Sequence, residues 1–205
     1  MSVKVKICGI TSVADGLAAA EAGADMIGLM FYERSPRCIS FEVAAEISRA
    51  LPGHIVRVGV FVNPEEDAVL RAIGECGIGL AQFHGEETPE FCSQFGVMSM
   101  KAIRVRDAES LLALPEYHTE AFLLDAYSPD AHGGTGAKFN WELAIDAKKY
   151  GRPIFLAGGL TPENVAEAVL KVQPFGVDVS SGVERAPGKK DAAKVRAFIE
   201  AVRAS

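Results

Sequence analysis

The sequence predicts an α/β protein, a single-domain (β/α)8 barrel that spans residues 1–205. Short runs rich in Val, Ile, Leu and Phe alternate with segments whose apolar residues recur at helical spacing. This pair repeats eight times along the chain, at intervals of about 25 residues, whereas a flavodoxin-like or Rossmann sheet needs only about five or six units. No linker rich in Pro, Gly or Ser and no low-complexity tract divides the chain.

The expected strands are short, apolar and bounded by Gly, Pro, Asn or Ser, which is typical of parallel strands buried on both faces. They are Val3–Cys8, Met26–Phe31, Ile55–Val62, Gly79–His84, Met98–Val105, Ala121–Asp125, Pro153–Ala157 and Gly176–Ser180.

The amphipathic segments between these strands are expected to form helices. They are Ser12–Ala22, Phe41–Ala50, Pro64–Cys76, Thr88–Phe95, Ala108–Leu114, Trp141–Tyr150, Pro162–Val172 and Lys190–Val202. Asn63, Thr88 and Thr161 each precede a proline, so we expect their side chains to cap helices that begin at that proline. The shortest helical signal is that of Ala108–Leu114.

Composition narrows the class of protein. The chain carries 21 basic and 27 acidic residues, a net charge of −6, and its basic residues are spread along the sequence. Nucleic acids and anionic membranes attract locally basic surfaces, so neither is an expected partner. No apolar run approaches the ~20 residues of a membrane span. The four cysteines show no CxxC spacing, so we expect no zinc site, no disulfide framework and a reduced cytoplasmic setting.

The catalytic candidates are polar residues at the carboxyl ends of the strands, where the active site of a (β/α)8 barrel lies. Cys8 ends the first strand, where a thiolate could serve as nucleophile or general base; the alternative is a small buried apolar residue. Asp125 ends the sixth strand, where it could be a general acid or base; the alternative is a carboxylate that orders a loop or caps a helix. On opposite walls, the two would supply two titratable groups to one substrate.

Three glycine-bearing segments follow the last three strands. They are Gly133-Gly134-Thr135-Gly136, Ala157-Gly158-Gly159-Leu160 and Ser180-Ser181-Gly182. Glycine lets backbone N–H groups approach an anion closely, and barrels often bind phosphate with the loops after strands seven and eight. We therefore expect a phosphate site at this part of the rim.

Four further residues are candidates for contacting a substrate. Arg37 follows the second strand, and its guanidinium suits a bidentate contact with a carboxylate or phosphate. Gln82 and His84 end the fourth strand and point the same way, and Asp178 lies near the end of the eighth. A hydrogen-bonded structural histidine is the default interpretation of His84. The four histidines are scattered, so no metal site is expected.

Motifs distributed over nearly the whole chain resemble, in the expected order, those of the phosphoribosylanthranilate isomerase family of tryptophan biosynthesis. They are Lys6-Ile7-Cys8-Gly9-Ile10-Thr11, Ser35-Pro36-Arg37, Gly59-Val60-Phe61-Val62-Asn63, Gln82-Phe83-His84-Gly85, Leu124-Asp125, Gly133-Gly134-Thr135-Gly136 with Phe139-Asn140-Trp141, Ala157-Gly158-Gly159-Leu160, and Asp178-Val179-Ser180-Ser181-Gly182-Val183-Glu184. The resemblance implies a single-domain barrel that acts on a small phosphosugar without a cofactor or metal.

The resemblance also implies a role for individual residues. Cys8 would be the general base, Asp125 the general acid, and Arg37 would hold the carboxylate of an anthranilate group. The backbone that would hold the phosphate is that around Gly134, Gly136, Gly158, Gly159, Ser180, Ser181 and Gly182. Two positions depart from the family pattern: Cys38 stands where many relatives carry an aromatic residue or histidine, and Asn140 where aspartate is common.

The implied reaction is an Amadori rearrangement of N-(5′-phosphoribosyl)anthranilate. Three alternatives are weighed against it. One is the related histidine-pathway aminoaldose isomerase, whose base at the end of strand one is an aspartate, unlike Cys8. The second is a phosphosugar-binding barrel without turnover. The third is an aldolase or synthase that uses Lys6 or Lys101 as a Schiff-base lysine. The sequence leaves both a monomer and a homodimer open.

Overall fold

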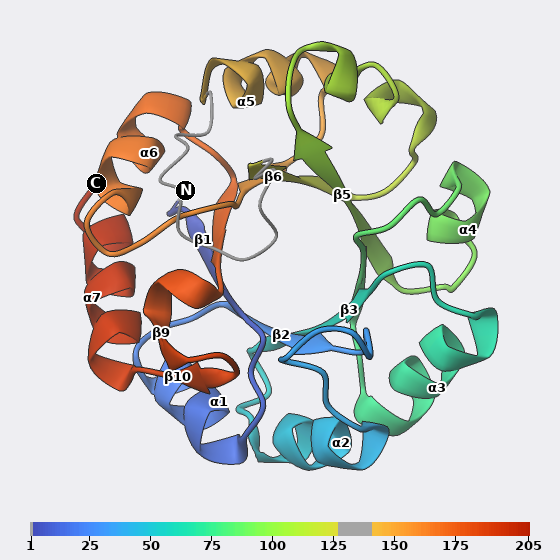
Figure 1. Cartoon of the computed structure of the whole chain (residues 1–205), viewed down its shortest axis with the longest axis vertical. Coiled ribbons are helices and arrows are strands. Elements are labelled where there is room, and N and C mark those ends of the chain that lie inside the picture. The colour runs from blue at the N-terminus through green and yellow to red at the C-terminus, as the bar shows by residue number, and fades with distance from the viewer. Residues whose placement is uncertain (1, 127–140) are drawn as a thin grey trace.

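Eight parallel strands close into a barrel in the computed structural model of the chain, which describes residues 2–126 and 141–205. Each strand pairs with its neighbour in the sequence, and β8 returns to pair with β1 (Figure 1). The strands are β1 Lys4–Cys8, β2 Met26–Met30, β3 Val56–Phe61, β4 Leu80–Phe83, β5 Met98–Val105, β6 Ala121–Ala126, β7 Ile154–Leu156 and β8 Gly176–Val179. The predicted fold class is therefore confirmed, and both ends of each predicted strand lie within two residues of the ends of the observed strand.

The α-helices form an outer ring around the barrel (Figure 1). They are α1 Val13–Glu21, α2 Phe41–Ala50, α3 Glu66–Cys76, α4 Pro89–Ser93, α5 Trp141–Ala147, α6 Val165–Val172 and α7 Ala192–Arg203, with the 3-10 turn η3 Lys148–Tyr150 directly after α5. Within the described ranges, none of these helices has the length and apolar character needed to cross a bilayer.

Alternation along the strands divides the core into two layers. On β1, Val5 and Ile7 belong to the large cluster between strands and helices, whereas Cys8 belongs to the smaller cluster inside the barrel. Because side chains on a strand alternate between its two faces, Lys6 shares the interior face with Cys8. Both faces of β1 are thus buried, which explains why the parallel strands contain so many apolar residues.

The predicted helix at Ala108–Leu114 is wrong. Two 3-10 turns take its place, η1 Glu109–Leu111 and η2 Leu114–Glu116. Pro115 follows Leu114 directly, and a proline disfavours the α conformation in the residue before it and lacks an N–H donor. Leu111 and Leu114 are still buried, so the leucine pattern correctly predicted which residues pack in the core but not the type of helix.

The three predicted proline-associated caps have different outcomes. Thr88 is confirmed, because its Oγ1 accepts a hydrogen bond from the N–H of Phe91 at the start of α4. Asn63 is not a cap: α3 begins at Glu66, and Asn63 adopts a positive φ of 46° while its Oδ1 accepts from the N–H of Glu86 at 2.7 Å. Asn63 instead joins the loops after β3 and β4. The cap predicted at Thr161 is not formed either, because α6 begins only after Asn164 and not at Pro162.

A short hairpin after β8 was not predicted. It consists of β9 Glu184–Ala186 and β10 Lys189–Lys190, and it follows the 3-10 turn η4 Ser181–Val183. The helix expected at Lys190–Val202 begins later, at Ala192, where the Asp191 side chain accepts from two backbone N–H groups. Lys190 therefore belongs to the hairpin, and this placement matters for the site.

The packing of α7 against the barrel yields a stability prediction. Phe198 is fully buried on α7, and Leu170 on α6 is 66% exposed. Replacing Phe198 with alanine removes a buried ring and leaves a cavity, so Phe198→Ala should lower the free energy of unfolding by about 3–5 kcal/mol. Leu170→Ala should change it by less than about 0.5 kcal/mol. Urea denaturation of both variants measures the difference, and equal losses would contradict the assigned packing of α7.

Candidate active site

Cys8 lies at the carboxyl end of β1 and lines the interior of the barrel. It is 6% exposed, and its Sγ would contact a side chain placed at Gly28 on the neighbouring strand. Beside it, Lys6 Nζ donates to Asp178 Oδ1 at 2.8 Å, and the two residues are register partners in β1 and β8. Asp178, expected to contact a substrate, is therefore engaged by Lys6 in the barrel interior.

Burial governs the acidity of the Cys8 thiol. Desolvation disfavours the thiolate and raises the pKa of Cys8, although the Lys6 ammonium opposes this rise. Burial alone would lower the pKa of Lys6, but the interactions with Asp178 and Cys8 together outweigh that effect and the pKa of Lys6 is raised. Lys6 thus stays an ammonium ion, which disfavours the Schiff-base role considered for it because that role needs a neutral amine.

Asp125 lies near the end of β6 and contacts His84, which directly follows β4 and in turn contacts Gln82. Its Oδ2 is 3.2 Å from Nε2 of His84, and Nδ1 of His84 is 3.2 Å from Nε2 of Gln82. When the Gln82 amide donates to Nδ1, the remaining ring proton is on Nε2 and points at Asp125. Gln82 and His84, which the sequence predicts to contact a substrate, lie in contact with each other, and His84 contacts Asp125.

A cavity of about 500 Å³ opens beside His84 and extends to Lys101 and Tyr117. Lys101 Nζ donates to Glu87 Oε2 at 2.6 Å and to the carbonyl of Gly85 at 2.7 Å. The second candidate Schiff-base lysine is therefore also engaged in a buried ion pair.

Arg37 lies in the loop after β2 and reaches over β1. A Cβ atom at Gly9, whose φ is +72°, would lie 2.5 Å from Cδ of Arg37 and 3.1 Å from Oγ of Ser180. Glycine is therefore required at position 9 both for its backbone conformation and for the close approach of Arg37. The Nε and Nη2 atoms of Arg37 donate to the two carboxylate oxygens of Glu184 at 2.8 and 2.7 Å.

The loops after β7 and β8 meet at glycines. Gly158 and Gly159 have positive φ angles of 81° and 68°. A Cβ at Gly182 would lie 2.0 Å from the carbonyl oxygen of Leu160, so the two loops touch there. Ser180 and Ser181 begin the turn η4 beside this contact. The other expected phosphate ligands, Gly134 and Gly136, lie outside the described residues, as does Asn140.

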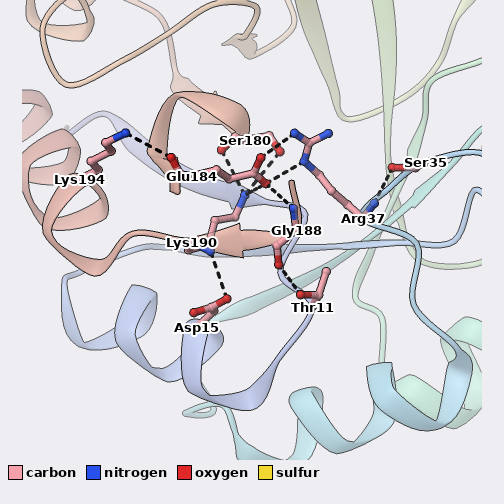
Figure 2. Close-up of polar contacts among 9 residues, drawn as sticks. All are labelled: Thr11, Asp15, Ser35, Arg37, Ser180, Glu184, Gly188, Lys190 and Lys194. Carbon is pink, nitrogen blue, oxygen red and sulfur yellow. Dashed lines mark hydrogen bonds and ion pairs between the residues drawn. The ribbon is translucent and has the colours of Figure 1, made fainter. Parts of the chain in front are cut away.

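The hairpin β9–β10 supplies two residues to which the sequence assigned no role, Glu184 and Lys190. Figure 2 shows their side chains directed toward each other, with Arg37 on one side and Ser180 on another. The Pro187-Gly188 dipeptide, a common turn signal between two short segments, was the sequence feature that could have indicated this hairpin.

The described residues contain no group of three or more His, Cys, Asp or Glu side chains arranged to bind a metal ion. What the rim does bring together is a thiol, a carboxyl group held by histidine, and an arginine, all in loops or strand ends at the catalytic end of the barrel. These features define a (β/α)8-barrel enzyme.

Comparison with known proteins identifies the family. Residues 5–201 match the family model described as N-(5′-phosphoribosyl)anthranilate (PRA) isomerase. An N-(5′-phosphoribosyl)anthranilate isomerase of Geobacter sp. (strain M21) is 58% identical over 196 residues, which are 96% of each chain. The chain therefore belongs to the N-(5′-phosphoribosyl)anthranilate isomerase family, and the resemblance found in the sequence motifs is confirmed.

Comparison with solved structures supports the same family assignment. The phosphoribosyl anthranilate isomerase of Thermotoga maritima is 41% identical with a TM-score of 0.93, and the match covers 99% of this chain and 100% of the other. A phosphoribosyl anthranilate isomerase in complex with reduced 1-(o-carboxyphenylamino)-1-deoxyribulose 5-phosphate is 39% identical, with a TM-score of 0.89 and the same coverage.

The contact between Gly182 and Leu160 generates a prediction. Gly182→Ala must push the loops after β7 and β8 apart, so it should lower the free energy of unfolding by about 1–3 kcal/mol. Gly74 in α3 is the matched control, because no atom lies within 4 Å of a Cβ built there. Gly74→Ala should be neutral or stabilising by up to about 1 kcal/mol. Thermal unfolding of both variants measures the contrast, and a neutral Gly182→Ala would show that the loops do not touch.

Proposed function

We propose that this chain catalyses the Amadori rearrangement of N-(5′-phosphoribosyl)anthranilate to 1-(2-carboxyphenylamino)-1-deoxyribulose 5-phosphate, a step of tryptophan biosynthesis. The observation that carries the proposal is the family match over residues 5–201. The positions of Cys8 and Asp125 support it, because both end strands of one barrel and therefore face the same rim.

Asp125 is the general acid in this proposal. In its protonated form it donates to the ring oxygen of the ribose, the bond from C1′ to that oxygen breaks, and the amine nitrogen supplies the electron pair that forms a Schiff base. Its contact with His84, 3.2 Å away, keeps the carboxyl group at the strand end. A fixed position favours proton transfer because the acid then needs no reorientation in the transition state.

Cys8 is the general base. Its thiolate removes the proton from C2′ of the Schiff base, which gives an enolamine, and tautomerisation to the ketone completes the rearrangement. The neighbouring Lys6 ammonium supports this role, because it opposes the effect of burial on the pKa of the thiol. Base and acid come from β1 and β6, so they approach the sugar from different sides.

Arg37 and the glycine loops hold the two ends of the substrate. Arg37 would bind the carboxylate of the anthranilate group, since a guanidinium matches a carboxylate with two parallel hydrogen bonds. Backbone N–H groups around Gly158, Gly159, Ser180 and Gly182 would bind the phosphate, because the glycines let the loops approach an anion closely. Fixing both ends holds C2′ between the acid and the base.

All of these groups belong to one chain, so the proposed reaction does not require a second subunit, and a monomer and a homodimer both fit. All four cysteines are free thiols, which fits the proposed cytoplasmic location.

Substitution of the acid and the base tests the proposal directly. Cys8→Ser and Asp125→Asn should each reduce kcat by about 10²–10⁴-fold, because general acid and base groups contribute factors of this size. The Michaelis constant should change far less, since Arg37 and the phosphate loops remain. Loss of substrate fluorescence on turnover measures both constants. Near-normal turnover by either variant would contradict the assigned role, and an inactive wild-type chain would contradict the proposed function.

The raised pKa of Cys8 predicts how kcat/KM depends on pH. Because burial raises the pKa of the thiol, the thiolate is the minor form at neutral pH and its fraction grows as the pH rises. The wild-type kcat/KM should therefore increase between about pH 7 and 9. In Cys8→Asp, a carboxylate base is already ionised in this range, so its weaker activity should lack the rise. A flat wild-type profile would show that no thiol ionises in the catalytic step.

A further inference from the structure

Glu184 occupies one edge of the Arg37 guanidinium. Its two oxygens accept from Nε and Nη2 of Arg37, a bidentate arrangement in which the carboxylate is almost fully buried. A guanidinium has five N–H donors in a fixed plane. After this contact, the two donors of Nη1 and one of Nη2 remain, and no described residue accepts a hydrogen bond from Nη1. These donors form the edge that can grip a second carboxylate in the same plane.

Lys190 holds Glu184 from the other side. Its ammonium is buried, lies 2.9 Å from Oε1 of Glu184 and donates to the carbonyl of Ser180 at 3.1 Å (Figure 2). Burial would raise the pKa of Glu184, but the hydrogen bonds and positive charges of Arg37 and Lys190 together outweigh this effect and lower the pKa. Glu184 therefore remains ionised and links Arg37, through Lys190, to the loop that follows β8.

The rest of the hairpin fixes this pair in place. The N–H of Gly188 donates to Oε1 of Glu184 at 3.2 Å, and the N–H of Lys190 donates to Oδ2 of Asp15 at 3.2 Å. Thr11 Oγ1 donates to the carbonyl of Gly188 (Figure 2). The hairpin is thus tied to the loop after β1 and to the start of α1, so Glu184 cannot move independently of the barrel.

The charges of the cluster favour an anionic ligand. Arg37 and Lys190 are positive and Glu184 is negative, so these three neighbouring side chains, of which Arg37 is partly exposed and the other two are buried, carry a net charge of +1. The buried ion pair between Lys6 and Asp178 is neutral overall. An uncompensated buried charge is costly, and a carboxylate on the open edge of Arg37 would compensate it.

We propose that Glu184 and Lys190 are positioning residues for the isomerase reaction: they present the Nη1–Nη2 edge of Arg37 to the substrate carboxylate and thereby set the preference for a carboxylate-bearing ring. The inference rests on the proposed function, in which Arg37 binds that carboxylate. Lys190 also joins this clamp to Ser180 in the phosphate loop, so the sites for the two ends of the substrate are built as one unit.

A comparison of two substrates tests the inference. The probes are N-(5′-phosphoribosyl)anthranilate and N-(5′-phosphoribosyl)aniline, which differ only in the ring carboxylate. The quantity measured is the ratio of their kcat/KM values. Arg37→Lys should reduce the wild-type ratio by about ten- to a hundredfold, because it removes a bidentate contact to a charged group. Glu184→Gln should reduce it by about tenfold or more, although Arg37 itself is unchanged.

Glu87→Gln is the matched control. Glu87 also forms a buried pair with a lysine, 2.6 Å from Nζ of Lys101, but in the loop after β4, two strands away from the β2 loop that holds Arg37. A general loss of stability affects both substrates alike, so this variant should leave the ratio unchanged even if both rates fall. Equal losses for both substrates in Glu184→Gln would assign Glu184 a purely structural role and overturn the inference.

A second variant covers the case in which Glu184→Gln does not fold. The double variant Glu184→Gln/Lys190→Met removes one negative and one positive charge together and leaves no unpaired lysine in the interior. It should lower the ratio as well, and an unchanged ratio would overturn the inference. The role of Arg37 in the proposed function is tested separately. A wild-type chain without preference for the carboxylate, or an Arg37→Lys variant that keeps this preference, would show that Arg37 does not bind the substrate carboxylate.

Discussion

The pairing of β8 with β1 is the constraint on which the site depends. This ladder closes the barrel and places Lys6 opposite Asp178, although 172 positions separate them in the chain. It also brings Cys8 beside the loop that begins at Ser180, so the proposed base and the proposed phosphate loop become neighbours. In a parallel sheet left open at this edge, the first strand would lie far from the loop after β8, and Cys8 would no longer be next to that loop.

Buried charge lies at this closure. Two ion pairs, Lys6 with Asp178 and Lys190 with Glu184, lie close to Cys8 with almost no exposure to solvent. Pairs of this kind contribute little to stability, because the desolvation of two ions offsets much of their attraction. Their value here is positional and electrostatic: the ammonium groups of Lys6 and Lys190 oppose the effect of burial on the pKa of the thiol, and Glu184 holds Arg37 in one orientation.

The loops of the catalytic rim contact one another directly. Asn63 joins the loops after β3 and β4, Gly182 touches the loop after β7, and the hairpin reaches from β8 to Thr11. Such mutual contacts keep loop residues in place without lengthening the strands. They explain why Asn63, which looks like a helix cap in the sequence, serves the rim instead.

The sequence by itself determined the barrel, because eight apolar runs with glycine or proline boundaries have few other ways to bury both faces of every strand. It also indicated Cys8, Asp125 and Arg37, since position at a strand end and side-chain chemistry are both visible in the chain. It did not reveal the 3-10 turns at Glu109–Leu111 and Leu114–Glu116, nor the partnership of Arg37 with Glu184. The 3-10 turns follow from Pro115, a local feature whose effect the leucine pattern obscured. Only the tertiary structure decided the partnership of Arg37 with Glu184, because hydrogen bonds between residues 147 positions apart depend on how the barrel closes, and no local pattern encodes that.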